Sequence, residues 1–146
     1  MGRKPRPRAK SAAADKGVGA GPSLFIRVRF GERGFIGPGK VELLELIERQ
    51  GSISAAGRAM GMSYRRAWMI IEELNRTFAA PLVGKQTGGS GGGGAVLTEL
   101  GKEVVTRYRR IEHTANEKTV EDLQALSDRL ATPDAATERN GGPHER

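Results

Sequence analysis

The stretch from Gly51 to Leu74, GSISAAGRAMGMSYRRAWMIIEEL, constrains the fold of this chain most strongly. It predicts two short helices joined by a tight turn at Gly61, because glycine adopts a positive φ without steric cost. Ser63 is a suitable N-cap for the second helix. Spacings of three and four residues predict one buried apolar stripe: Ala67, Ile70, Ile71, Leu74 and Phe78. A helix that packs by its C-terminal part and begins with cations suits a DNA major groove, so we predict a helix-turn-helix.

Four side chains at the start of the second helix are candidates for DNA contact: Tyr64, Arg65, Arg66 and Trp68. A charged helix start can be only a solvated surface, but two cations there oppose the helix dipole, which favours a contact role. Arg65 or Arg66 could donate two hydrogen bonds to a guanine, worth about 1–3 kcal/mol of discrimination. The sequence does not decide between them. Trp68 is equally compatible with packing against the preceding helix.

The segments before Gly51 predict a strand followed by a helix. Apolar and polar residues alternate across Ser23–Phe30, as in a half-buried strand. Lys40–Gln50 has apolar residues at helical spacing, with Gly51 as its C-cap. Ser52 or Ser54 then begins the next short helix, and both serines are counted among the candidate DNA contacts together with Ser63.

A glycine-rich hairpin is predicted after Pro81. Leu82 to Gln86 and Ala95 to Leu97 indicate two short strands around the loop TGGSGGGG. A phosphate-binding P-loop needs GxxxxGK[ST] between a strand and a helix, whereas here the lysine precedes the glycines. A hairpin beside a helix-turn-helix can bring its backbone amides to phosphates. We therefore count the hairpin's residues among the candidate DNA contacts: Lys85, Thr87, Gly88, Gly89 and Ser90.

A last long amphipathic helix is predicted from Thr98 and Glu99 onward. Its apolar residues step by three and four: Leu100, Val104, Tyr108, Ile111 and Ala115. A similar pattern continues from Val120 to Leu130, so we expect the helix to extend through residues 117–131. Little of the domain remains for so long a helix to cover. That imbalance favours pairing with a second copy in a homodimer.

The chain is basic, with a formal net charge of +7. Residues 1–16 contribute +5 and residues 117–146 contribute −3, so the middle of the chain also carries +5. A polyanionic partner is therefore expected, with nucleic acid before a membrane surface. Residues 1–22 and 132–146 have little to bury and are expected to be disordered. The basic arm is either a solubilising tail or a segment that lies on phosphates or in a minor groove.

Composition argues against several other classes of protein. The chain has no cysteine, which excludes disulfides, thiolate metal sites and cysteine nucleophiles. Its two histidines, His113 and His144, lie on the predicted exposed side of the last helix and in the tail. Nothing orients them as a catalytic base or metal ligands, so we expect neither an enzyme nor a cofactor. Without a long apolar run, the chain is expected to be soluble, cytoplasmic and free of membrane contact.

The order of these motifs resembles the N-terminal DNA-binding domain of the ModE family of molybdate-responsive transcription regulators. The resemblance covers roughly Leu24 to Asn116. It rests on GSIS at Gly51–Ser54, SY-x-x-AW at Ser63–Trp68 and TGG-x-GGGGAVLT at Thr87–Thr98. The helix-turn-helix alone is shared more loosely with LysR-type regulators.

The resemblance implies a mainly α fold with a small β component, a winged helix-turn-helix with a long C-terminal dimerisation helix. It places that domain at residues 23–116, between the arm and the helix extension. Two copies would bind a palindromic operator in double-stranded DNA, pairing through the N-terminal strand region and the C-terminal helix. Tyr64, Arg65 and Arg66 match exposed positions of the family's reading helix, and the wing would reach the flanking backbone.

Full-length family members add C-terminal oxyanion-binding domains, and this chain ends about where these would begin. We expect them to be absent, in which case a separate protein would supply any oxyanion sensor. The leading hypothesis is a sequence-specific regulator of molybdenum transport or cofactor genes. Two alternatives are a sequence-tolerant architectural DNA binder driven by the basic arm, and a small molybdate- or oxyanion-binding protein that uses the glycine loop.

Overall fold

Four helices and a two-stranded hairpin surround the core of the protein. The computed structural model describes residues 21–86 and 94–132. Its helices are α1 (Pro38–Gln50), α2 (Ile53–Ala59), α3 (Tyr64–Thr77), α4 (Glu99–Lys118) and α5 (Val120–Ser127). Strands β1 (Val28–Arg29) and β2 (Phe35–Ile36) form one antiparallel pair around the short 3-10 helix η2 (Gly31–Arg33), and β3 (Val83–Gln86) and β4 (Gly94–Leu97) form another. The mainly α fold with a small β component is confirmed.

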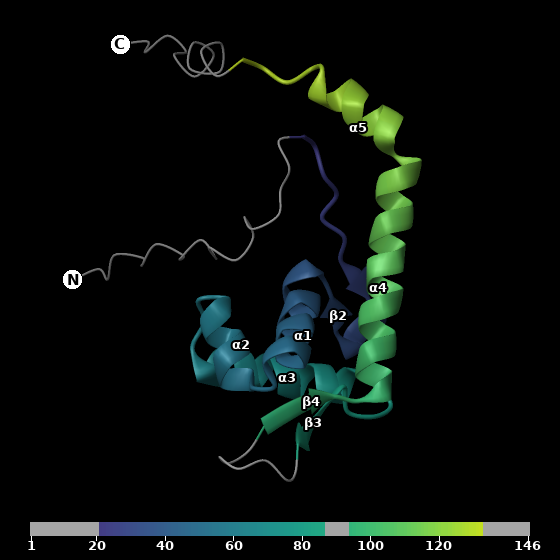
Figure 1. Cartoon of the computed structure of the whole chain (residues 1–146). Coiled ribbons are helices and arrows are strands. Elements are labelled where there is room, and N and C mark those ends of the chain that lie inside the picture. The colour runs from purple at the N-terminus through teal and green to yellow at the C-terminus, as the bar shows by residue number, and fades with distance from the viewer. Residues whose placement is uncertain (1–20, 87–93, 133–146) are drawn as a thin grey trace, which may run out of the picture.

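The elements are arranged with the β3–β4 hairpin at one end of the molecule and α5 at the other (Figure 1). Helix α4 runs along one side of the molecule and contacts α1, while α2 packs against α1 and α3 (Figure 1). We call the β3–β4 hairpin the wing. Helices α1 to α3 followed by the wing are the elements of a winged helix-turn-helix.

The core lies between α1, α2, α3, the wing and α4, and its members follow the predicted periodicity. Ala67, Ile71 and Leu74 of α3 are buried, and Ile70 and Phe78 pack against them from the edge. The fully buried side chains of the other elements are those of Val41, Leu43, Leu44, Ile47, Ala56 and Leu82. The apolar stripe predicted for the second helix of the helix-turn-helix is therefore confirmed.

The two predicted glycine turns are also confirmed. Gly51 ends α1 in the left-handed region at φ 66°, and its amide donates to the carbonyl of Ile47. Gly61 turns the chain between α2 and α3 at φ 70°. Both positions favour glycine because a Cβ is strained at such φ values.

The N-terminal strand is much shorter than the predicted Ser23–Phe30. Only Val28 and Arg29 pair with β2, because β2 has two residues before Gly37 leads into α1. The alternation of burial nevertheless continues upstream, where the Ile26 carbonyl accepts a hydrogen bond from Tyr108 Oη at 2.9 Å. The segment before β1 is thus held by α4 rather than by a strand. Phe25 is left 71% exposed.

The last helix does not run unbroken through residues 117–131 as predicted. It ends at Lys118, and Thr119 has φ −113° and ψ 10°, outside the helical range. The Thr119 hydroxyl donates to the Ala115 carbonyl at 2.7 Å, a back-bond that bends helices. The short helix α5 follows at an angle to α4 (Figure 1), and none of its residues is buried.

Side chains of α4 fix it against the rest of the fold. Tyr108 is 1% exposed, and its burial and the neighbouring Glu112 carboxylate raise its pKa to about 12. Its hydroxyl therefore stays protonated as the donor to Ile26. Arg109 donates from Nε to Glu45 of α1 at 3.2 Å and from Nη1 to Glu112 at 2.7 Å. These carboxylates, Glu45 most of all, raise the pKa of Arg109 further, so its guanidinium stays charged.

Candidate nucleic-acid interface

Ser63 begins α3 as predicted. Its Oγ accepts a hydrogen bond from the backbone amide of Arg66 at 3.1 Å, which satisfies one of the free amides of the first turn. The cap fixes the start of the helix, so Tyr64, Arg65 and Arg66 project from an ordered first turn. Ser63 thus has a structural role in addition to the DNA contact predicted for it.

The predicted contact residues of α3 are all exposed. Tyr64 is 58% exposed, Trp68 is 46% exposed, and both arginines belong to the exposed class. Large aromatic surfaces usually favour burial, so two on one helix start mark a surface suited to a partner. Trp68, for which the sequence left two alternatives, presents about half of its surface to solvent.

Helix geometry separates the two arginines. Side chains turn by about 100° per residue, so Arg65 and Met69 share the face opposite the buried stripe of Ala67 and Leu74. Arg66 lies on one flank of that face. Met69 is 55% exposed and was not among the predicted contact residues. Because Met69 lies four residues after Arg65, helical spacing alone could have placed it among the predicted contact residues.

The serines at the start of α2 are occupied by intramolecular hydrogen bonds. Ser52 is the N-cap, and its Oγ accepts from the Ala55 amide at 3.1 Å. Ser54 accepts from Nη1 of Arg58 at 3.2 Å. Both serines are half-buried, so any contact with DNA would use the remaining hydrogen-bonding capacity of their hydroxyls.

The wing lies next to the turn that leads into α2. The amide of Ala95 in β4 donates to the carbonyl of Gly51 at 2.9 Å, which places the loop-side half of the strand pair, where Ala95 pairs with Lys85, against that turn. Lys85 in β3 is exposed. Four predicted contact residues, Thr87, Gly88, Gly89 and Ser90, lie outside the described residues. The structure thus brings α2 and β3, the strand that carries Lys85, to the same end of the molecule as α3 (Figure 1).

Three exposed cations at this end have no acidic partner in the part of the chain that the structure describes. Within residues 21–86 and 94–132, no ion pair involves Arg65, Arg66 or Lys85. Some other cations of these residues are paired, such as Lys40 with Glu73 at 3.3 Å, and some, such as Arg29 and Arg110, are not. Exposed cations without acidic partners are available to phosphates.

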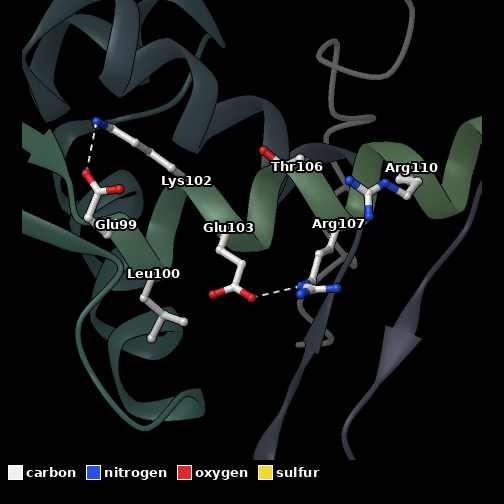
Figure 2. Close-up of a pocket in the computed structure, with 7 residues that line it drawn as sticks. All are labelled: Glu99, Leu100, Lys102, Glu103, Thr106, Arg107 and Arg110. Carbon is white, nitrogen blue, oxygen red and sulfur yellow. Dashed lines mark hydrogen bonds and ion pairs between the residues drawn. The ribbon is translucent and has the colours of Figure 1, made fainter.

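A separate hollow of about 480 Å³ runs along α4 (Figure 2). All seven lining residues come from this one helix: Glu99, Leu100, Lys102, Glu103, Thr106, Arg107 and Arg110. Its charges pair with each other, Lys102 with Glu99 and Arg107 with Glu103 (Figure 2). Small-molecule sites are normally enclosed and largely apolar. This hollow is lined mostly by charged side chains of a single helix, so it is part of the exposed surface of α4.

The described part of the chain contains no group of three or more His, Cys, Asp or Glu side chains placed to hold a metal ion. Among its helices, none combines the length and the apolar character needed to cross a membrane.

Comparison with known proteins agrees with this geometry. Residues 39–102, from α1 to the first turn of α4, match the family model described as bacterial regulatory helix-turn-helix protein, lysR family. The chain therefore carries a helix-turn-helix domain of the LysR type. The chain is also similar to ModE proteins, which is consistent with a ModE-like helix-turn-helix domain.

Three relatives illustrate that similarity. The molybdenum-pterin-binding protein MopB of Rhodobacter capsulatus is 47% identical over 77 residues, which cover 53% of this chain and 28% of that protein. The molybdenum transport protein ModE of Azotobacter vinelandii is 38% identical, covering 60% and 36%. The DNA-binding transcriptional dual regulator ModE of Escherichia coli K12 is 38% identical, covering 58% and 32%. The chain thus spans about a third of the length of these relatives.

Proposed function

We propose that this chain is a DNA-binding transcription regulator of the ModE type that acts in the cytoplasm on genes of molybdenum transport or cofactor metabolism. The observation that carries the proposal is the start of α3. Two arginines and two exposed aromatic side chains project there from a capped first turn, while the opposite side of the helix is packed into the core. Similarity to ModE regulators supports the link to molybdenum.

Each contact residue has a proposed role. Arg65 lies near the middle of the exposed face, beside Met69, and reads a base edge in the major groove. Arg66 and Lys85, on the flank and on the wing, bind phosphates that fix the register of the domain on the duplex. Tyr64, Trp68 and the serines Ser52, Ser54 and Ser63 contribute contacts to sugar and phosphate around these three cations.

The functional unit is a homodimer on a palindromic operator. Apolar side chains that would be poorly solvated in a monomer gather on the segment before β1, on α4 and on α5. Phe25 is 71% exposed and Ile111 is 46% exposed, and the remaining members are Val120, Leu126 and Leu130. An isolated helix of eight residues is marginal in water, so α5 in particular needs a surface to pack against. A second copy of the chain provides such a surface. The two-fold symmetry of the resulting dimer would match the symmetry of the operator.

Binding to duplex DNA is expected to weaken steeply with salt. With about two cations per copy bound to phosphates, a dimer would release about four counterions, so affinity should fall on the order of 10²-fold between 50 and 200 mM salt. Fluorescence anisotropy with a labelled duplex measures this slope. A loss of less than about tenfold over that range would contradict a phosphate-anchored interface.

Substitution of the exposed apolar residues is expected to dissociate the dimer. Replacing Leu126 and Ile111 with aspartate places charges on the proposed contact and should shift the sedimentation coefficient from that of a dimer to that of a monomer. Replacing Val96, which is exposed on the wing, with aspartate is the control and should leave the dimer intact. A wild-type chain that sediments as a monomer at tens of micromolar would refute the pairing.

A further inference from the structure

We infer that Asn75 is a positioning residue that fixes the wing at a set distance and angle from the reading helix α3. This inference rests on the DNA-binding function proposed above. Asn75 lies in the last turn of α3, about three turns from Arg65, and contributes no side chain to the predicted DNA surface. Its effect on DNA binding would therefore be exerted through the wing.

The amide group of Asn75 bonds to the first residues of the wing. Its Oδ1 accepts from the backbone amides of Leu82 at 2.8 Å and Val83 at 3.3 Å. Its Nδ2 donates to the carbonyl of Val83 at 3.4 Å. The side chain thus pairs with the edge of β3 as a neighbouring strand would, while β4 occupies the other edge.

The same short segment, residues 81–83, also forms hydrogen bonds with Thr98, the residue that precedes α4. The carbonyl of Leu82 accepts from the backbone amide of Thr98 at 2.9 Å, and the Thr98 hydroxyl donates to the carbonyl of Pro81 at 2.7 Å. Thr98 in turn caps α4 by accepting from the Gly101 amide. Residues 81–83 are therefore held from one side by Asn75 and from the other by the first turn of α4.

These bonds set the geometry of the proposed interface. Lys85 lies two residues beyond Val83 on the same strand, so anchoring Leu82 and Val83 to α3 also fixes Lys85 relative to Arg65. A duplex can then meet both cations at once without ordering the wing on binding. Pre-organisation of this kind raises affinity because less conformational entropy is lost in the complex.

Helix periodicity supports a positioning role. Asn75 stands seven residues after Trp68 and eleven after Tyr64, so these three residues share one flank of α3. The two aromatic contact residues of the reading helix and the tether of the wing thus lie on the same flank, opposite the flank that carries Arg66. Without the tether, the amides of Leu82 and Val83 would lose their partners, although both residues are buried.

The test uses the full chain and a duplex that it binds. Asn75→Ala is expected to lower affinity for that duplex about tenfold and to reduce the salt slope, because the wing's phosphate contacts are no longer aligned. The matched control is Thr77→Val, in the same turn of α3. It removes a hydroxyl that is a donor to two carbonyls, that of Glu73 in α3 at 2.8 Å and that of Arg33, on the connection between β1 and β2, at 3.1 Å. It should cost a similar amount of thermal stability with less than a twofold change in affinity.

A double-mutant cycle with Lys85→Ala separates positioning from general destabilisation. If Asn75 acts by placing the strand that carries Lys85, Asn75→Ala should cost threefold or less in the Lys85→Ala background, compared with about tenfold in the wild type. Asn75→Asp keeps the acceptor for both amides but loses the donor to the Val83 carbonyl, so it should restore only part of the stability lost in Asn75→Ala.

The outcomes are distinguishable. Equal, additive losses in both backgrounds, with an unchanged salt slope, would overturn the positioning role. An Asn75→Ala chain that binds as the wild type does would overturn it as well. Failure of the wild-type chain to bind any duplex would instead contradict the proposed function itself.

Discussion

Replacing Arg65 and Arg66 together with alanine is expected to abolish the preference of this protein for its operator over random DNA. A bidentate arginine–guanine contact is worth about 1–3 kcal/mol, and a dimer makes each contact twice, so operator affinity should fall by at least about 30-fold. Competition of labelled operator with random-sequence duplex measures the change. Binding to random DNA should weaken much less, because Lys85 and the remaining cations still meet phosphates.

The single variants assign the roles of the two arginines. Arg65→Ala should relax sequence preference at one position of each half-site, whereas Arg66→Ala should weaken binding about equally on all sequences and lower the salt slope. The assignment follows from the helix face that each side chain occupies. The opposite pattern would exchange the two roles, and an unaltered preference in the double variant would refute α3 as the reading helix.

Replacing Gly101 with alanine is expected to destabilise the fold severely. A Cβ at this position would lie 2.2 Å from the carbonyl oxygen of Leu82, so the backbone of either α4 or the wing must move. Overpacking typically costs about 1–3 kcal/mol and occasionally more, and a clash with backbone belongs at the upper end. Alanine's better helix propensity offsets about 1 kcal/mol, which leaves a net loss of about 2 kcal/mol or more.

Thermal denaturation followed by circular dichroism measures this effect, and a midpoint lowered by about 10 °C or more is expected. Gly39 is the matched control, because it also lies in the first turns of a helix, α1, but a Cβ there meets nothing within 4 Å. Gly39→Ala should leave the midpoint unchanged or raise it slightly. A Gly101→Ala chain as stable as the control would show that α4 does not pack this closely against the wing.

The parts of the fold that depend on nearby residues could be predicted from the sequence. The left-handed turns at Gly51 and Gly61, the Ser63 cap and the buried stripe of α3 each follow from residues within a few positions. The break at Thr119 also has a local cause, because the Thr119 hydroxyl donates to a carbonyl of α4. We did not predict this break, because the apolar pattern continues beyond Thr119.

The remaining features depend on contacts between distant segments. The segment before β1 lost its predicted strand because β2 is only two residues long and the Tyr108 hydroxyl, from α4, occupies the Ile26 carbonyl. Asn75 was not predicted to matter, because its partners Leu82 and Val83 can be recognised only when the chain has folded back on α3. Asparagine near a helix end has several roles, and the sequence gives no reason to choose this one.

Selection of bound sequences from a random pool of duplex DNA tests the central claim most directly. The proposed dimer of winged helix-turn-helix domains should enrich one motif made of two inverted half-sites, with centres about one helical turn, or a whole multiple of it, apart. Arg65→Ala should lose preference within each half-site while keeping their spacing. Recovery of sequences without any common motif, from a chain that is folded and binds DNA, would contradict sequence-specific recognition by α3.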